Sequence, residues 1–404
     1  IGQVTSMTGM FAGFGYDYYW SFQKAVEDIN ALGGVKVGDK RIPVRVIVYD
    51  DESDPTKAAS LTTQLILVDN VVAVTGHGVP SINIPEGTVC DQYKVPAIFP
   101  MVPFEPWHAA MESTEYNWAF SFRIGTPPPE GDFRHGKPGY TLLEGAFIFT
   151  DMFANQTNRK VAVLASADAD GAGWYAVFGP SLEERGYEPY RVDENFGLYP
   201  PGTTDFSSII LAWKEAECQI LWANLPAPDF GVFWRQAHQL GWVPKMALAA
   251  RAAMIYEDVV TWGGDLPLGI VDENFWSSAY PYPGIGNRTA QSLADEWYEE
   301  KGTPIGDRAR GYGAAQLLFA AIEEAGTLDR EAINDAFLKV DITTIYGRHK
   351  FIPETHDSPC AVTIVQWFKT ENPWVWERRV VYSNVPEITA TNDPIFPLPG
   401  CTFP

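Results

Sequence analysis

The order of elements in the first hundred residues constrains the fold of this chain more than any other feature. A short start at 2–4 precedes a glycine-punctuated loop over 8–15, and apolar residues at helical spacing predict a helix over about 16–32. A mostly apolar or β-branched strand is expected at 41–48, and a second helix leads to a strand at 71–75. This βαβαβ order predicts an open parallel sheet, in which ligands bind at the carboxyl ends of the strands.

Local residue choices mark several boundaries of these elements. The glycine pair at 33–34 can supply the left-handed residue that ends the first helix. Either Ser53 or Asp54 can cap the second helix, whose first turn would hold Pro55. A fourth strand is expected at 96–100.

A second set of alternating strands and helices follows in the middle of the chain. Strands are expected at 161–165, 191–195, 220–223 and 246–250, and helices are expected from Trp174, over 206–217 and over 230–240. This repetition predicts a second doubly wound domain. A chain of 404 residues also exceeds what one compact core usually accommodates, which agrees with two domains.

The composition and the motif inventory argue against several functional classes. The net charge is −22, from 51 acidic and 29 basic residues, whereas binding nucleic acid needs a basic face. No apolar run approaches the roughly 18 residues of a membrane-spanning helix. No GxSxG, HExxH, P-loop or dinucleotide motif occurs, and no CxxC or histidine cluster suggests a metal. We therefore expect a binding protein that is not an enzyme and has no cofactor, metal or nucleic-acid partner.

Several stretches together carry a family resemblance. They are 8–15, 25–34, 49–51 with 54–55, 76–78, 205–209, 235–237 and 312–315. In order and approximate spacing, over roughly residues 1–370, they resemble the periplasmic solute-binding proteins of branched-chain amino-acid-type ABC transporters. Each motif alone is weak, so the resemblance depends on the ordered set.

The resemblance implies an α/β fold of two doubly wound parallel-sheet domains joined by a three-strand hinge, the type I periplasmic binding protein fold. The first domain would comprise 1–122 plus 275–345, and the second 123–274 plus 346–404. The proline-rich tail beyond about Ser383 has no counterpart in the family pattern.

The resemblance also implies a function. The protein would be an extracytoplasmic, periplasmic receptor that captures a small organic ligand in the interdomain cleft by hinge closure. It would deliver that ligand to an ABC permease in the membrane, and we expect it to be a monomer. Because Ile1 opens almost directly into the first strand, we expect that an export signal has been removed. Lipidation of the native N-terminus stays open.

Ligand-binding residues are carried over position by position. Phe14 matches the aromatic residue of the first loop, and Ser81 is the hydroxyl that survives after the third strand. An acidic position that pairs with a ligand ammonium falls at Ala250 or Arg251. Trp107, Trp174 and Tyr280 sit on or beside loops at the ligand edge. The candidate set is Phe14, His77, Pro80, Ser81, Val102, Pro103, Asp170, Trp174, Pro226, Arg251 and Tyr280.

Departures from the family pattern point to the ligand. Several polar anchors for a zwitterionic amino acid are replaced by apolar groups, and Pro103 offers neither a hydroxyl nor an N–H. A buried ammonium without a carboxylate partner would cost several kcal/mol, whereas a guanidinium can clamp a carboxylate with two bonds. We therefore expect a carboxylate with an apolar or aromatic body and no α-ammonium, held by Arg251 and stacked on Phe14.

Alternatives stay open at this point. An amino acid could bind with its ammonium at Asp170, which could also hold another cation or a sugar hydroxyl. Arg251 could pair with a nearby acid for structural reasons, and His77 could support the sheet edge without touching ligand. A ligand sensor on the same fold is a further possibility, although no DNA-binding or kinase domain is fused to the chain.

Two other features have open roles. A bridge between Cys360 and Cys401 would pin the tail in an oxidising compartment, whereas Cys90 and Cys218 read as buried small residues. The loop 126–139 combines three consecutive prolines with a basic cluster. It is either a surface insertion or a lip that attracts an anion.

Overall fold

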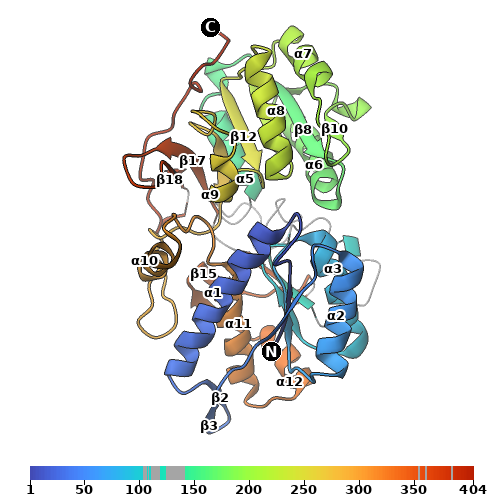
Figure 1. Ribbon diagram of the computed structural model, residues 1–404, viewed down its shortest axis with the longest axis vertical. Helices are drawn as coiled ribbons and strands as arrows, with labels where there is room; N and C mark the ends of the chain where they lie inside the picture. The colour runs from blue at the N-terminus through green and yellow to red at the C-terminus, as the bar shows by residue number, and fades with distance from the viewer. Residues whose placement is uncertain are drawn as a thin grey trace. The chain divides into compact units, whose positions relative to one another are not determined.

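The computed structural model describes residues 1–102, 107, 109–110, 119–123, 142–353, 355–359, 362–383 and 385–404 (Figure 1). The chain folds into two compact units. The first unit comprises Ile1–His135, Trp276–Glu296 and Asp307–Ala361, and the second comprises Gly136–Phe275, Trp297–Gly306 and Val362–Pro404. Each unit is α/β with a sheet rich in parallel strands, which confirms the predicted fold class.

The first unit is built on a parallel sheet in the order β16-β7-β6-β5-β1-β4. Its strands are β1 (Gly2–Thr5), β4 (Ile47–Asp50), β5 (Val74–Thr75), β6 (Ala97–Phe99), β7 (Ala119–Arg123) and β16 (Asp357–Pro359). Its helices include α1 (Ala12–Ala31), α2 (Pro55–Leu67), α3 (Pro80–Tyr93), α11 (Arg310–Ala325) and α12 (Arg330–Phe337). Two antiparallel hairpins join β2 (Val35–Val37) to β3 (Lys40–Ile42) and β14 (Asp341–Thr344) to β15 (Gly347–Lys350).

The second unit has a mixed sheet in the order β10-β8-β11-β12-β13-β17-β18, with β9 beside β8. Its strands are β8 (Lys160–Ser166), β9 (Glu188–Pro189), β10 (Leu198–Tyr199), β11 (Ile220–Asn224), β12 (Met246–Ala250), β13 (Val271–Asn274), β17 (Thr363–Lys369) and β18 (Trp376–Tyr382). Its helices include α5 (Leu142–Asp151), α6 (Ala169–Glu184), α7 (Ser207–Glu215), α8 (Ala227–Gln239) and α9 (Tyr256–Val260), while α10 (Ala290–Lys301) begins in the first unit. Strands β8 to β13 pair in parallel, and β17 and β18 pair antiparallel.

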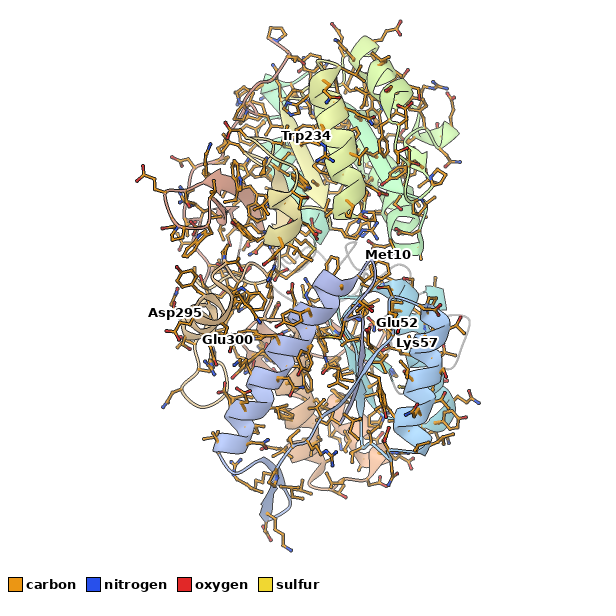
Figure 2. All side chains as sticks on the ribbon, viewed as in Figure 1. Met10, Glu52, Lys57, Trp234, Asp295 and Glu300 are labelled. Atoms are coloured by element: carbon orange, nitrogen blue, oxygen red, sulfur yellow. The ribbon has the colours of Figure 1, made fainter. Side chains whose placement is uncertain are left out.

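The start of α2 follows the cap chemistry of its sequence. The Asp54 side chain accepts from the backbone N–H groups of Thr56 at 2.7 Å and Lys57 at 2.9 Å. Ser53, the other candidate cap, instead donates its hydroxyl to the Thr8 carbonyl at 2.9 Å. Glu52 pairs with Lys57 at 2.6 Å across this helix start (Figure 2). The loop after β1 is therefore tied to the start of α2.

Two predicted strands are wrong in their extent or type. The expected strand at 41–48 is split between β3 and β4, because Pro43 has no N–H to donate and Asn30 bonds both backbone groups of Val44. The expected strand at 191–195 is a 3₁₀ turn over Val192–Glu194 between β9 and β10. Positive φ angles at Arg191 and Asn195, 52° and 54°, are incompatible with an extended strand.

Tryptophan contributes mainly to the cores. Trp213, Trp234, Trp242 and Trp262 are almost fully buried in the core of the second unit, where Trp234 stacks on Phe230 at 5.7 Å (Figure 2). In the first unit, Trp107 packs edge-on against Phe99. The number of tryptophans in the chain is thus explained by packing and gives no support to a sugar-stacking site.

The C-terminal tail is part of the second unit. Its backbone donates from Leu398 to the Lys245 carbonyl at 2.9 Å and from Thr402 to the Val243 carbonyl at 3.0 Å. Phe396 stacks on Phe153, with ring centroids 4.1 Å apart. Cys401 is a free thiol, and its expected partner Cys360 lies outside the described residues. Hydrogen bonds and ring packing hold the tail.

The division into units differs from the predicted domain boundaries in several segments, one of which is 297–306, predicted for the first domain but found in the second unit. The prediction returns the chain to the second domain at residue 346, whereas 346–361 lies in the first unit. The reason is that β16 extends the first sheet by pairing in parallel with β7, from Asp357 with Ser121 to Pro359 with Arg123. The predicted loop at 126–139 lies outside the described residues.

Both units place a glycine of the helix after the first sheet strand against the backbone at that strand's end. A Cβ atom on Gly15 of α1 would lie 1.9 Å from the Ser6 carbonyl oxygen. A Cβ atom on Gly171 of α6 would lie 2.1 Å from the Ser166 carbonyl oxygen. Only glycine lets these helices approach so closely, and this contact fixes the first turn of each helix beside the ligand edge.

We predict that Gly171→Ala destabilises the second unit, because its methyl group collides with backbone that cannot rotate away. The expected loss is about 1–3 kcal/mol of unfolding free energy. Gly145→Ala in α5 is the matched control, since its Cβ would meet only the Ile364 side chain at 3.5 Å. Urea unfolding of both variants tests this, and equal stabilities would contradict it.

Candidate functional site

A buried hydrogen-bonded chain joins the carboxyl ends of three neighbouring strands in the first unit. Ser6 follows β1, Asp51 follows β4 and His77 follows β5, and all three side chains are inaccessible to solvent. The Ser6 hydroxyl donates to Asp51 Oδ1 at 2.5 Å and lies 3.2 Å from His77 Nε2. These contacts hold the three strand ends in register at the predicted ligand edge.

The protonation state of His77 follows from this chain. Because the only proton of the Ser6 hydroxyl goes to Asp51, His77 Nε2 carries a hydrogen and donates to Ser6. His77 Nδ1 is then a bare acceptor, without a partner among the described residues. Burial, with a smaller contribution from the Arg310 charge, lowers the pKa of His77 to about 3, so the imidazole is neutral. The structure therefore gives His77 the supporting role at the sheet edge that the sequence left open.

A second cation of the first unit lies beside the predicted ligand residues. Arg310 is the first residue of α11, and its guanidinium carbon lies 5.1 Å from the centroid of the Phe14 ring. Phe14 is half-buried in the first turn of α1. Arg310 is not among the residues that the sequence predicts, because it joins this edge from almost 300 positions along the chain. The available signal was the pair of arginines at 308 and 310 just before the 312–315 motif.

The other predicted residues of the first unit lie in different environments. Pro80 and Ser81 form the first turn of α3, where Pro80 is buried and Ser81 is half-buried. Val102 is 1% exposed and belongs to the core, so it packs the unit. Tyr280 is buried and meets Tyr282 edge-on at 6.0 Å. Pro103 lies outside the described residues.

In the second unit, the structure brings together three predicted residues around one guanidinium. Arg251 follows β12 with a left-handed φ of 64°. Its two terminal nitrogens bond the two oxygens of Asp168 at 3.2 and 3.0 Å, and Nη1 also lies 3.1 Å from Asp170 Oδ2. Trp174 Nε1 donates to Asp170 Oδ1 at 3.1 Å. Arg251 is thus paired with two acids, which matches the structural alternative and leaves no free clamp at this position.

Burial and charge act differently on the two aspartates. Burial opposes ionisation of Asp168, but Arg251 and the N–H of Gly171 outweigh it and lower its pKa. Burial dominates at Asp170 and raises its pKa to about 6, since Arg251 only partly offsets burial and the charges of Asp168 and Glu273. Two carboxylates therefore share one guanidinium, and Asp170 is the one that protonates more readily.

Pro226 completes the predicted set in the second unit. It is the N-cap residue of α8 and follows β11, which pairs with β8 on one side and β12 on the other. Its half-buried ring therefore lies on the loop between those that carry Asp168 and Arg251. The three loops come from adjacent strands of one sheet.

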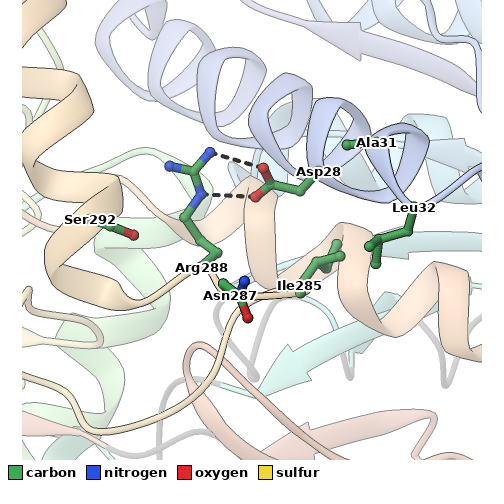
Figure 3. Close-up of a pocket in the computed structure, with 8 residues that line it drawn as sticks. Asp28, Ala31, Leu32, Ile285, Asn287, Arg288 and Ser292 are labelled. Atoms are coloured by element: carbon green, nitrogen blue, oxygen red, sulfur yellow. Dashed lines mark hydrogen bonds and ion pairs between the residues drawn. The ribbon is translucent and has the colours of Figure 1, made fainter.

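A cavity of about 300 Å³ lies in the first unit at the opposite end of α1 from Phe14 (Figure 3). It is lined by Asp28, Ala31, Leu32, Ile285, Gly286, Asn287, Arg288 and Ser292. Arg288 bonds both oxygens of Asp28 at 2.8 and 2.9 Å, and Tyr312 donates to Asp28 Oδ2 at 2.6 Å. These charged groups already pair with one another. The cavity therefore lies beside a structural contact between α1 and the 283–289 segment.

The described residues also bear on two other kinds of site. No group of three or more His, Cys, Asp or Glu side chains in the described part of the chain is placed to hold a metal ion. No helix among the described elements is long and apolar enough to span a membrane.

Known proteins of one family match this sequence over nearly its whole length. Residues 1–372 match the family described as periplasmic binding protein. An amino acid binding protein of Pseudomonas aeruginosa is 24% identical over 352 residues, covering 87% of this chain and 85% of that protein. The leucine-, isoleucine-, valine-, threonine-, and alanine-binding protein of the same organism is also 24% identical, over 90% of this chain and 88% of its own length.

Solved structures share the fold. The leucine binding protein LivK of Thermotoga maritima superimposes with a TM-score of 0.74 at 20% identity, covering 95% of this chain and 98% of that one. A solute binding protein of an ABC transporter from Rhodopseudomonas palustris, in complex with 3,4-dihydroxy benzoic acid, gives a TM-score of 0.71 at 22% identity, covering 96% and 97%. At these identities the likeness concerns the fold.

We predict that Arg251→Met destabilises the second unit whether or not ligand is present, because it leaves Asp168 and Asp170 without their shared partner. Removing one member of a buried ion pair costs about 3–5 kcal/mol. The matched control is the triple variant Arg251→Met, Asp168→Asn, Asp170→Asn, which should recover most of that loss. Urea unfolding measures both, and a single variant as stable as wild type would show that the pairing is not structural.

A second prediction concerns acid stability. The pKa of His77 falls from its ordinary value of 6.5 to about 3 on folding, so the folded state binds fewer protons between these values. Stability from this group is therefore lost as pH falls below 6.5, by about 1.4 kcal/mol per pH unit.

His77→Gln should remove this component. The drop in melting temperature between pH 7.5 and pH 5 should be smaller in the variant than in wild type, even if the variant is less stable at pH 7.5. An equal drop in melting temperature in the variant and in wild type over that pH range would refute a neutral, buried His77.

Proposed function

The chain belongs to the periplasmic binding protein family and is a solute-binding protein of the branched-chain amino-acid type, and from this premise we propose which ligand it captures. Proteins of this family are periplasmic, bind small ligands and deliver them to a membrane permease, and they are not enzymes. We propose a small organic carboxylate with an apolar or aromatic body and without an α-ammonium. We further propose that the protein works as a monomer.

The contacts and the pKa of Asp170 are the main support for this proposal. An α-amino acid needs an ionised carboxylate to face its ammonium, and Asp170 is the predicted ligand residue that could supply one. Its Oδ2 already pairs with Arg251 and its Oδ1 already accepts from Trp174. Burial also raises its pKa to about 6, so an ammonium would have to be desolvated beside a buried carboxylate whose two oxygens already have partners. A ligand without an ammonium avoids this unfavourable desolvation.

Apolar side chains near the strand ends of each unit support the second half of the proposal. Phe14 offers a half-buried ring in the first unit, and Pro226 offers a half-buried ring in the second. Such faces bind a hydrocarbon or aromatic body through the hydrophobic effect. The structural neighbour from Rhodopseudomonas palustris was solved with an aromatic acid, which shows that this fold can hold one.

An amino acid is the second candidate, and one observation favours it. The two Pseudomonas aeruginosa relatives carry amino-acid-binding names, and one of them is 24% identical over 87% of this chain. In that case Asp170 would have to exchange its bond to Arg251 or Trp174 for one to the ligand. The two candidates differ only in the ammonium, so matched compounds separate them.

We predict that melting temperature rises with carboxylates that lack an amine, such as 3,4-dihydroxybenzoate and 4-methylpentanoate, and does not rise with free amino acids. L-leucine is the matched control for 4-methylpentanoate, since it adds the α-ammonium. Ligand at about 100-fold excess over its dissociation constant should stabilise the protein by about 2.7 kcal/mol. Stabilisation by L-leucine alone would overturn the carboxylate proposal and make Asp170 the ammonium partner.

A further inference from the structure

Arg310 is the guanidinium at a ligand edge that has the fewest compensating contacts. Its side chain is 5% exposed, and its ion-pair contact is with Asp307 Oδ2 at 4.0 Å. Its Nε has no hydrogen-bond partner among the described residues. Among the described residues, its guanidinium carbon also lies over the Phe14 ring, 5.1 Å from the centroid.

Two other arginines have much closer carboxylate contacts, although the Nε of Arg251 likewise has no hydrogen-bond partner among the described residues. Arg251 reaches carboxylate oxygens at 3.0, 3.1 and 3.2 Å, and Arg288 reaches them at 2.6, 2.8 and 2.9 Å. A guanidinium that leaves water without such bonds costs several kcal/mol. The ring of Phe14 returns only part of this cost through a cation–π contact. The position of Arg310 therefore favours an additional anion.

The surroundings of Arg310 also suit an anion. It opens α11, and the N-terminal end of a helix carries a partial positive charge. Gly311 N donates to Ser21, and a Cβ on Gly311 would lie 2.2 Å from the Tyr18 carbonyl, so α11 starts in close contact with α1.

We propose that Arg310, and not Arg251, binds the anionic group of the ligand, with the Phe14 ring as the adjoining apolar surface. The inference depends on the proposed function, since it names the residue that would recognise a carboxylate in that site. It assigns the specificity for an anion to the first unit. Arg251 then has a structural role, because its charge is already used by Asp168 and Asp170.

The competing interpretation is that Arg310 is a structural member of a neutral cluster. Arg308 pairs with Asp17 at 3.3 Å and Arg310 lies 4.0 Å from Asp307, so two arginines are matched by two aspartates. A structural Arg310 would stabilise the ligand-free protein. An arginine that awaits a ligand anion would destabilise it, because its charge is buried without adequate partners. The sign of the stability change therefore separates the two roles.

The experiment compares wild type with Arg310→Met, Arg310→Lys and the control Arg45→Met, which removes the same charge from an exposed position of the first unit. Titration calorimetry uses 3,4-dihydroxybenzoate and 4-methylpentanoate, each beside its primary amide. We expect Arg310→Met to weaken carboxylate binding on the order of tenfold to hundredfold and to leave amide binding unchanged. Arg310→Lys should fall between, since lysine keeps the charge without the planar fork.

The ligand-free melting temperature is the second readout. We expect Arg310→Met to melt higher than wild type and Arg45→Met to melt at the wild-type temperature. Wild-type affinity in Arg310→Met, or a lower melting temperature in that variant, would overturn the assignment. If wild type binds none of the carboxylates, the proposed ligand class is wrong, and the melting temperature alone then decides whether Arg310 is an under-compensated cation.

Discussion

Polar side chains that tie neighbouring strand ends together are the constraint on which both candidate ligand edges depend. In the first unit, Ser6, Asp51 and His77 join the ends of β1, β4 and β5 through hydrogen bonds of 2.5 and 3.2 Å. In the second unit, Asp168 and Arg251 join the loops after β8 and β12 across the intervening β11. Parallel strands end at one edge of a sheet, so their loops crowd polar groups together, and each buried group needs a partner.

The sequence predicts most of the fold because its apolar strands and its cap residues act locally. The strand at 246–250 and the cap at Asp54 follow from neighbouring residues alone. The strand at 41–48 fails because a distant side chain, Asn30, takes both backbone groups of Val44. No local sequence pattern indicates this hydrogen bond between residues that are far apart in the chain. The placement of the tail depends likewise on bonds to Lys245 and Val243, more than 150 residues away.

The candidate site shows the same limit more sharply. A family pattern can carry over the type of residue at a position, and in this way it places Phe14 and Arg251 at strand ends. It cannot show what each side chain pairs with. Arg251 looks like a free clamp in the sequence, yet it bonds Asp168, which is not among the predicted ligand residues. Arg310 comes from a helix start far along the chain, so no local motif links it to Phe14.

The two units use arginine in opposite ways, and this difference bears on how ligand preference changes within such a fold. At Arg251 the number of carboxylates exceeds the number of cations, so added negative charge would compete with Asp168 and Asp170. At Arg310 one carboxylate stands at 4.0 Å and an aromatic ring covers one face. An incoming anion therefore gains most where the internal pairing is weakest. Specificity for a charged ligand then depends on how many protein partners each arginine already has.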